Sequence, residues 1–271
     1  MKVNRSYRVS IIQNMPLFEI EQSIENSLQL IKKAAAHAEL IILPEMFITP
    51  YEFALMPKAA AFSEYTLLML ADIARETNTF ICAGSIPVHL PHKAKLTNTS
   101  FLLDTSGRII ASYNKCHLFD VSLPEITVCE SKVFSPGNDV SVTDTALGKI
   151  GVAICYDIRF PELCRKLALL GMQLLCVPAA FSQTTGSAHW HTVMRARAIE
   201  NQVYLCAASP ARNPDSSYPA YGHSMIVSPW GEIVAEAGID EQIITAEINM
   251  SYLEKVRRQL PLLKHRRPEL Y

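Results

Sequence analysis

One segment near the middle of the chain joins an apolar stretch to a helix through a single cysteine: Lys149-Ile150-Gly151-Val152-Ala153-Ile154-Cys155-Tyr156-Asp157-Ile158-Arg159-Phe160-Pro161-Glu162-Leu163. The apolar character of residues 149–154 is typical of a buried strand. Pro161 is compatible with the first turn of a helix, which we expect over residues 160–170. A strand that leads through a short turn into a helix is the building unit of layered α/β proteins.

Strands and helices alternate on both sides of this segment. In the first half we expect strands at 8–13, 40–43 and 80–83, helices at 20–37 and 63–77, and a hairpin over 97–112. In the second half we expect strands at 149–154, 174–177 and 203–208, helices at 160–170 and 188–201, and a hairpin over 223–236. The shared order predicts a duplicated unit and an α/β fold of αββα type, with two sheets face to face and helices outside.

The two predicted hairpins support this duplication because they align without gaps at an offset of 124 residues. The alignment pairs Ser100 with Ser224, Gly107 with Gly231, Ile109 with Ile233 and Ala111 with Ala235. No linker rich in Gly, Pro or Ser divides the chain, so we expect a single domain over residues 1–271. The stretch 116–139 lacks clear periodicity and is long for a connection, which makes it a candidate active-site loop.

The composition is that of a globular protein. The chain has 271 residues, of which 49% are hydrophobic, so it can bury a sizeable core. Its 25 Lys and Arg residues nearly balance 26 Asp and Glu, and a net charge of -1 offers no positive field to nucleic acid. With 16 Pro, 10 Gly and 19% charged residues, the disordered, collagen-like and coiled-coil classes are excluded.

Cysteine usage and hydropathy indicate a cytoplasmic protein that does not enter a membrane. The seven cysteines are an odd number without a C-x-x-C pair, which predicts neither a disulfide framework nor a zinc ribbon. The most apolar run, 167–181, is interrupted and too short to span a bilayer as one helix. Lys2 and Arg5 are followed by too few apolar residues for a signal peptide.

Common cofactor and metal motifs are missing. The sequence has no G-x-G-x-x-G, Walker or G-x-S-x-G pattern, so the signatures of dinucleotide binding, P-loop hydrolysis and serine hydrolysis are absent. His189 and His191 flank Trp190, but on the helix expected at 188–201 they point apart. No third ligand lies at a familiar spacing, and we therefore expect no metal and no cofactor.

Cys155 is the best candidate nucleophile because it follows an apolar strand, where α/β folds place reactive groups. A free thiol has a pKa of about 8.5. To react as a thiolate, it requires a nearby cation or helix N-terminus that lowers this pKa. Cys82, Cys176 and Cys206 lie inside predicted strands and are expected to be core residues. Glu45 and Lys115 also lie just past the ends of predicted strands, although each alone is equally typical of a surface position.

Three blocks around these positions resemble the signature blocks of the nitrilase superfamily of carbon-nitrogen hydrolases. They are Leu43-Pro44-Glu45-Met46-Phe47, Tyr113-Asn114-Lys115-Cys116-His117-Leu118-Phe119-Asp120, and the segment from Gly151 to Glu162. The resemblance continues nearly to both ends and is closest to the omega-amidase type of the Nit branch, as in Ser209-Pro210-Ala211-Arg212-Asn213 and Tyr221-Gly222-His223-Ser224. The segment from Cys155 to Leu163 is equally similar to the sister enzymes that hydrolyse deaminated glutathione.

The resemblance implies a Glu-Lys-Cys triad made of Glu45, Lys115 and Cys155. In this family the cysteine attacks an amide carbonyl and forms a thioester, and the glutamate transfers protons. Lys115, with the Tyr156 backbone N–H, would stabilise the oxyanion. A further glutamate of the family, which helps hold the lysine, matches Glu130, with Glu125 as the local competitor. Two buried carboxylates beside one lysine should raise the pKa of a carboxylate.

The resemblance also implies the substrate class. Omega-amidases release ammonia from short dicarboxylic acid monoamides such as alpha-ketoglutaramate, whose free carboxylate needs a polar clamp. The candidates for this clamp are Arg159, Arg212, Tyr51 and Thr185. The alternatives are deaminated glutathione or another small amide or carbamoyl substrate, and, in a different class, a catalytically idle interaction protein.

Family members commonly form homodimers through the helices after the nucleophile. These correspond here to residues 160–170 and 188–201, and Leu260, Leu262 and Leu263 could extend the contact. We therefore expect a homodimer that binds a small-molecule amide.

Overall fold

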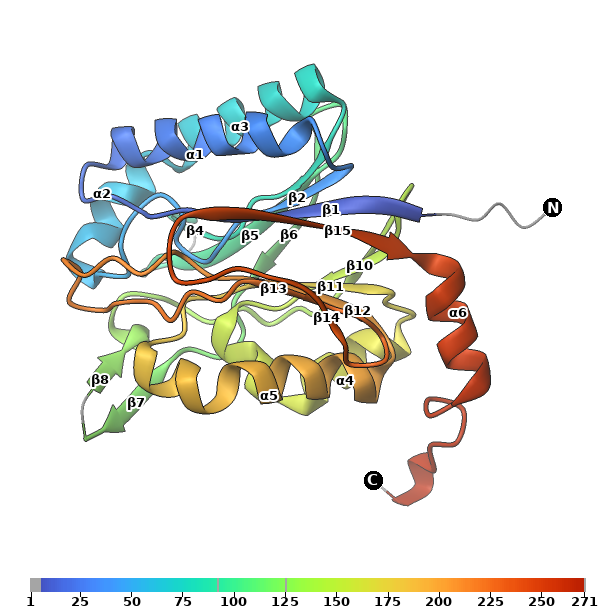
Figure 1. Cartoon of the computed structure of the whole chain (residues 1–271). Coiled ribbons are helices and arrows are strands. Elements are labelled where there is room, and N and C mark those ends of the chain that lie inside the picture. The colour runs from blue at the N-terminus through green and yellow to red at the C-terminus, as the bar shows by residue number, and fades with distance from the viewer. Residues whose placement is uncertain (1–5, 92, 125, 271) are drawn as a thin grey trace.

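The computed structural model describes residues 6–91, 93–124 and 126–270 (Figure 1). Two of the features used above lie outside these residues, namely the N-terminal charges Lys2 and Arg5 and the competing carboxylate Glu125. Among the described helices, none combines the length and apolar character needed to cross a membrane.

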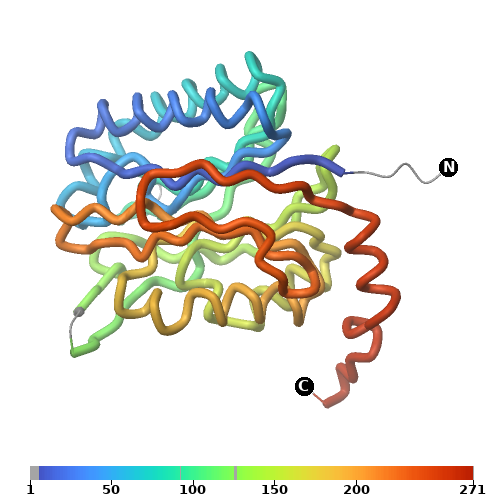
Figure 2. Tube along the Cα trace, viewed as in Figure 1, coloured from blue at the N-terminus to red at the C-terminus, as the bar shows by residue number. Residues whose placement is uncertain are grey.

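The first sheet is built by the N-terminal half and closed by the last strand of the chain. Its order is β15-β1-β2-β3-β5-β4, and β6 pairs with β5. The strands are β1 (Ser6–Gln13), β2 (Leu40–Ile42), β3 (Phe80–Cys82), β4 (Ile86–Val88), β5 (Thr97–Leu103), β6 (Ile109–Asn114) and β15 (Gln242–Asn249). β1, β2 and β3 are parallel, whereas β15 pairs antiparallel with β1, so that the first and last strands of the chain lie side by side (Figure 2).

The second sheet has the order β14-β13-β12-β11-β10-β9. Its strands are β9 (Val142–Thr145), β10 (Gly148–Val152), β11 (Leu174–Pro178), β12 (Tyr204–Ala208), β13 (Met225–Val227) and β14 (Ile233–Glu236). β10, β11 and β12 are parallel and are followed by an antiparallel hairpin, as in the first sheet.

Helices cover the outer face of each sheet, so that the expected αββα order of layers is confirmed (Figure 1). The first sheet carries α1 (Ile20–Ala35), α2 (Met56–Ala61) and α3 (Ser63–Thr77), and the second carries α4 (Pro161–Leu169) and α5 (Gln183–Asn201). The helix α6 (Met250–Gln259) follows β15 at one end of the sandwich. Short helical turns are η1 (Phe53–Leu55), η2 (Glu130–Lys132), η3 (Cys155–Arg159) and η4 (Pro268–Leu270).

Three apolar layers hold these elements together. One lies between α1, α3 and the first sheet, and another between α4, α5 and the second. The third lies between the two sheets and contains Cys82, Cys176 and Cys206, all with no exposed surface. These cysteines pack as small apolar side chains, as expected.

The predicted internal repeat is visible in the two hairpins. Both have a register shift at the same place, between Leu102 and Leu103 in one and between Ile226 and Val227 in the other. Both turn at a glycine with positive φ, +77° at Gly107 and +87° at Gly231. In each turn the glycine N–H donates to the backbone oxygen three residues earlier, at 2.9 Å. The offset of 124 residues therefore relates equivalent structures.

Several predicted boundaries are wrong. α5 begins at Gln183 rather than at 188, because the Ser182 hydroxyl caps its first turn by accepting from the Thr185 N–H. β10 ends at Val152, so Cys155 starts a helical turn instead of closing the strand. The stretch 116–139, expected to be irregular, contains a hairpin of β7 (Asp120–Leu123) and β8 (Ile126–Cys129). Eight other elements were not predicted, and most of them are short or lie at sheet edges: η1, α2, β4, η2, β9, β15, α6 and η4.

Gly84 determines how closely two chain segments approach beside β2 and β3. Its φ is +47°, and a Cβ at this position would lie 2.0 Å from the Pro44 backbone oxygen. The next residue, Ser85, forms a bridge with Glu45 and donates its N–H to Pro44. Glycine is required here because a side chain would push the Pro44–Glu45 segment away.

We expect Gly84→Ala to lower the free energy of unfolding by about 2–4 kcal/mol, because the added methyl meets backbone rather than a movable side chain. Thermal and urea unfolding measure this loss. The control is Gly238→Ala, where no atom lies within 4 Å of the added Cβ and the change should stay within about 1 kcal/mol. Equal effects at the two glycines would contradict the steric argument.

Candidate active site

Glu45, Lys115 and Cys155 converge at one end of the two sheets. Glu45 follows β2, Lys115 directly follows β6, and Cys155 begins η3 after β10. The carboxyl ends of these strands meet at the same edge, which brings together residues separated by 70 and 40 positions. All three side chains are buried, with exposed fractions of 0% for Glu45, 1% for Lys115 and 6% for Cys155.

The Lys115 ammonium lies between two carboxylates. Its Nζ is 2.9 Å from Glu45 Oε1 and 2.8 Å from Glu130 Oε2, and none of the three side chains has exposed surface. Glu130 lies on η2 and also accepts a hydrogen bond from the Phe119 N–H at 2.6 Å. The structure thus brings Glu130 to the triad, as the resemblance implied.

Asn98 is part of the same network and was not predicted. Its Nδ2 donates to Glu45 Oε1 at 2.8 Å and to Glu130 Oε1 at 3.2 Å. It lies in β5, inside the polar run Thr97-Asn98-Thr99-Ser100. An asparagine within an otherwise buried strand is the signal that could have identified it, because buried amides require partners.

The charges in this network shift the pKa values of its members. Burial alone would lower the pKa of Lys115, but Glu130 and Glu45 outweigh burial and hold it well above its usual value. Burial raises the pKa of Glu45, and the charge of Glu130 raises it further, against the opposing effect of Lys115. The expectation of one carboxylate with a raised pKa therefore agrees with Glu45.

The expected lowering of the Cys155 pKa is wrong. Burial raises the pKa of this thiol well above its usual value, and the charge of Glu45 raises it further. Lys115 and the Ala180 backbone N–H act in the opposite direction without outweighing these effects. The raised pKa therefore favours the thiol form of Cys155 in the free site.

The backbone at Cys155 adopts a conformation that is uncommon for a side-chain-bearing residue. Its φ is +48°, in the left-handed region. The following residue, Tyr156, lies in the first turn of η3, where backbone N–H groups have no helical partner. This turn therefore presents the sulfur together with a donor group.

Asp157 connects the cysteine turn to the lysine segment. Its carboxylate is fully buried and contacts the Tyr113 hydroxyl at 2.7 Å, His117 N and Nδ1 at 2.8 Å each, and the Ile154 N–H at 3.1 Å. Tyr113 and His117 flank Lys115, and Ile154 precedes Cys155. One carboxylate thus fixes the relative positions of both segments.

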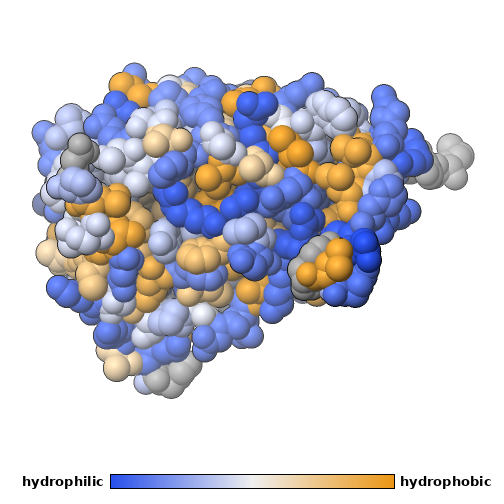
Figure 3. Space-filling view, turned by 90° about the horizontal axis from the view of Figure 1, so that it is seen from below, coloured by the Kyte–Doolittle hydropathy of each residue, from blue (hydrophilic) through white to orange (hydrophobic). Residues whose placement is uncertain are grey.

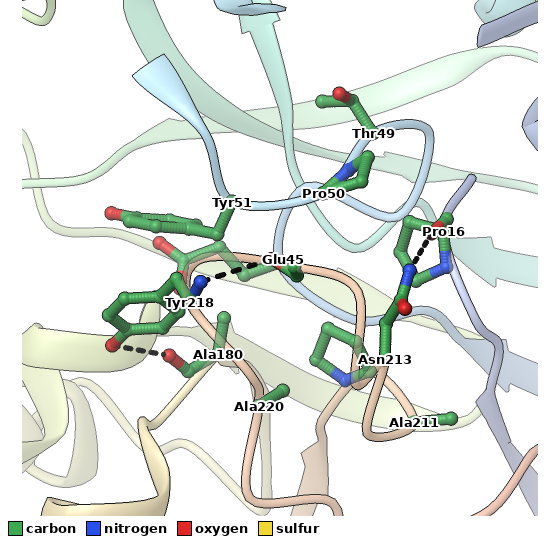
Figure 4. Close-up of a pocket in the computed structure, with 12 residues that line it drawn as sticks. Pro16, Glu45, Thr49, Pro50, Tyr51, Ala180, Ala211, Asn213, Tyr218 and Ala220 are labelled. Carbon is green, nitrogen blue, oxygen red and sulfur yellow. Dashed lines mark hydrogen bonds between the residues drawn. The ribbon is translucent and has the colours of Figure 1, made fainter. Parts of the chain in front are cut away.

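A pocket opens beside Glu45 (Figure 4). Its wall includes Tyr51 and Tyr218, whose rings lie 5.1 Å apart, and Ala180, whose oxygen accepts from the Tyr218 hydroxyl at 3.0 Å. Three buried oxygens on this wall have no hydrogen-bond partner among the described residues: Glu45 Oε2, Thr49 Oγ1 and the Tyr51 hydroxyl. Unpaired buried polar groups around a pocket indicate a polar ligand.

Arg159 places a positive charge near the cysteine. Its guanidinium stacks 4.4 Å from the Phe181 ring centre and contacts His189 Nδ1 at 3.1 Å. Burial lowers the pKa of Arg159, against the opposing effects of Cys155, Tyr156 and Tyr218. Arg159 ends the η3 turn that Cys155 begins, so the two residues are near each other. Within the described chain Arg159 forms no ion pair with a carboxylate, so neither Asp157 nor Glu162 neutralises it.

The structure gives the other two clamp candidates different surroundings. Thr185 belongs to the cap of α5, where its hydroxyl lies 3.1 Å from that of Ser182. Arg212 donates to the backbone oxygens of Ala220 and Tyr221 and contacts the Gln183 amide. Both side chains are engaged in holding loops, and no hydrogen bond joins either to the triad in the described part of the chain.

Comparisons with known proteins agree with this geometry. The model of the carbon-nitrogen hydrolase family matches residues 8–258. Omega-amidase NIT2-A of Xenopus laevis is 42% identical over 98% of this chain and 96% of its own. The crystal structure of Saccharomyces cerevisiae Nit3, a member of branch 10 of the nitrilase superfamily, has a TM-score of 0.89 at 37% identity and 97% coverage of both chains.

A more distant structure bears on the chemistry. It is an amidase mutant from Nesterenkonia sp. AN1 that shows covalent addition of the acetamide moiety of fluoroacetamide at its active-site cysteine. Its TM-score is 0.80 at 25% identity, over 97% of this chain and 94% of that one.

The fold, the cluster of buried charges and the family match define a hydrolase of carbon–nitrogen bonds. The chain belongs to the carbon-nitrogen hydrolase family, within the nitrilase superfamily, and is an amidase.

Proposed function

We propose that this amidase removes the terminal amide of small dicarboxylic acid monoamides, of which alpha-ketoglutaramate is the type, and yields the acid and ammonia. The observation that carries the proposal is the position of Arg159, a cation without a carboxylate partner in the described chain, in the same helical turn as Cys155. A monoamide supplies the missing carboxylate at one end and the reactive amide at the other. The relatives named omega-amidase support the same substrate class.

The first step is attack of Cys155 on the amide carbon. The sulfur forms a bond to this carbon while its proton passes to Glu45, whose Oε2 has no other partner among the described residues. The carbonyl oxygen becomes negatively charged and is stabilised by the Lys115 ammonium and the Tyr156 N–H. Losing one such donor costs about 3 kcal/mol of transition-state stabilisation.

In the second half of the reaction, Glu45 gives up the proton that it accepted and then accepts another from water. Glu45 protonates the amide nitrogen, the carbon–nitrogen bond breaks, and ammonia leaves a thioester on Cys155. Glu45 then takes a proton from water, whose oxygen attacks the thioester carbon and releases the acid. The proton returns to the sulfur, which restores the thiol that burial favours. Glu130 holds Lys115 in place throughout.

Glu45→Gln should slow turnover but make the Cys155 thiol more reactive. We expect turnover to fall about 10²–10⁴-fold, because glutamine does not accept the proton. The pKa of Cys155 should fall as well, because the charge of Glu45 raises it in the native site. Ammonia release measures the first effect, and the pH dependence of iodoacetamide labelling at Cys155, followed by mass spectrometry, measures the second.

The control for this experiment is Glu64→Gln on the exposed face of α3, which should change neither quantity. A Glu45→Gln enzyme with full turnover would contradict the role of Glu45 as the base. Failure of Cys155 to react with iodoacetamide in the native enzyme at any accessible pH would instead favour an idle interaction protein.

The substrate proposal is tested by ammonia release from alpha-ketoglutaramate, deaminated glutathione and neutral butyramide. We expect the first to be the best substrate. Arg159→Met should raise its KM by about 10–100-fold, because a charge-assisted hydrogen bond to the substrate carboxylate is lost. The KM for butyramide should stay nearly constant.

Arg75→Met provides a matched control, since Arg75 is an exposed helix residue paired with Asp72. Equal losses on charged and neutral amides in Arg159→Met would contradict a carboxylate clamp. A clear preference for deaminated glutathione would assign the enzyme to the sister activity.

We also propose a single catalytic domain that acts as a cytoplasmic homodimer. The family match over residues 8–258 supports one domain. Exposed apolar side chains lie on α4 and α5, the helices where the dimer contact was expected, and also on the β13–β14 hairpin. Figure 3 shows apolar patches on the lower face of the molecule. These side chains are Leu169, Leu170, Ile199, Trp230, Ile233 and Val234. Apolar surface of this kind is typical of an interface.

Ile199→Asp should convert the dimer to a monomer, because it places a charge among these apolar side chains. Size-exclusion chromatography with light scattering measures the mass. The control is Leu68→Asp on α3, which is 57% exposed and belongs to the other helix layer. A dimer that is lost equally in both variants, or retained in Ile199→Asp, would contradict this interface.

A further inference from the structure

His191, His223 and Glu236 come together outside the pocket, from a helix and from the two arms of a hairpin. His191 lies on α5, His223 precedes β13, and Glu236 ends β14. His191 Nε2 is 2.7 Å and His223 Nδ1 is 3.3 Å from the same oxygen, Glu236 Oε1. Among the described residues, this is the one group of three potential ligands whose atoms all lie within 4.8 Å of one another.

The backbone around this group is well fixed. The Trp190 indole N–H donates to the His223 oxygen at 2.7 Å, which ties α5 to the loop before β13. The His223 N–H donates to the Gly238 oxygen at 2.9 Å, which ties the same loop to the end of the hairpin. Trp190 has no exposed surface, so the neighbouring His191 is held by a residue anchored in the core.

The two histidines of this helix therefore have different partners. As expected for a helix, His189 points away from His191 and contacts Arg159. The hairpin supplies the other two ligands, His223 and Glu236, at a sequence distance from His191 that no spacing motif covers. No metal was expected because the sequence has no third ligand at a familiar spacing. In the folded chain this reason does not hold, because folding brings distant ligands together.

We propose that His191, His223 and Glu236 bind a Zn²⁺ ion. Two imidazole nitrogens and one carboxylate oxygen suit zinc and neighbouring first-row metals, and do not suit Mg²⁺ or Ca²⁺, which prefer oxygen ligands. Zinc bonds of about 2.0–2.2 Å in a tetrahedral site separate the ligand atoms by about 3.3 Å. The His223–Glu236 distance already has this value, and the His191–Glu236 distance must widen by a small rotation of partly exposed side chains.

The positions of the imidazole hydrogens allow zinc to replace the hydrogen bonds to Glu236. In the free protein, His191 Nε2 and His223 Nδ1 each lie within hydrogen-bonding distance of Glu236. When zinc binds, the hydrogen of each neutral imidazole resides on the other ring nitrogen, and both facing lone pairs coordinate the ion. The side chains are between 27% and 37% exposed, which leaves access for a water molecule as the fourth ligand. This site is independent of the proposed amide substrate.

The test is isothermal titration of EDTA-treated full-length Cys155→Ser protein with ZnCl₂. The serine removes the active-site thiol as a competing ligand. We expect one ion per chain, and binding weakened by about tenfold or more in His191→Ala, His223→Ala and Glu236→Gln. The exposed His37 provides a control, since His37→Ala should bind zinc like the parent protein. A spectrum with Co²⁺ should lack the intense near-ultraviolet band of thiolate ligation.

Absence of binding, unchanged binding in the three variants, or thiolate ligation of Co²⁺ would overturn the site. One ion per two chains would also overturn it, because the metal would then belong to a contact between copies. Since the His223 backbone has a φ of +56°, its replacement could disturb folding. Glu236→Gln keeps the shape of the side chain, and circular dichroism with a melting curve verifies that it is folded, so this variant decides the outcome.

Discussion

A positive charge buried between two negative ones is the constraint on which the rest of this molecule depends. An isolated ammonium with no access to water is very unfavourable, and Lys115 is tolerated only because Glu45 and Glu130 both contact it. Removing one partner from such a network typically costs about 3–5 kcal/mol. The elements that carry these groups must therefore meet with correct geometry. The amide of Asn98 adds a second, uncharged link between the two carboxylates.

The same arrangement determines the protonation state of the cysteine. Two carboxylates and one ammonium already carry a net negative charge, and a buried thiolate would add another. The structure therefore favours the thiol, with a proton acceptor beside it. In the proposed reaction the nucleophile is generated only when the substrate is in place, because negative charge then moves from sulfur to a carbonyl oxygen near the ammonium. A resting thiol is also less prone to oxidation or alkylation than a resting thiolate.

Much of this could be predicted from the sequence where a regular signal was present. The apolar runs before Glu45 and Cys155 predicted strands, and positions just past strand ends predicted that distant residues meet. Of the two partners of Lys115, Glu45 could be identified from its position after a predicted strand, whereas only the resemblance pointed to Glu130. Asn98 was missed because an asparagine in a strand indicates a buried partner only when that strand is known to be buried. The hydrogen bonds of Asp157 depend on three segments at once. The sign of the Cys155 pKa shift depends on burial, which a sequence does not quantify.

The repeated architecture does not produce a repeated reaction centre. In the second half, the residue that follows Pro178, as Glu45 follows Pro44, is the buried Ala179. The offset between the hairpins places Ile239 where the first half has Lys115. The duplicated units thus contribute different groups: one contributes the ammonium and its counter-charges, and the other contributes the sulfur. Neither unit by itself contains a complete set of reacting groups, so catalysis in this chain is a property of the contact between its two halves.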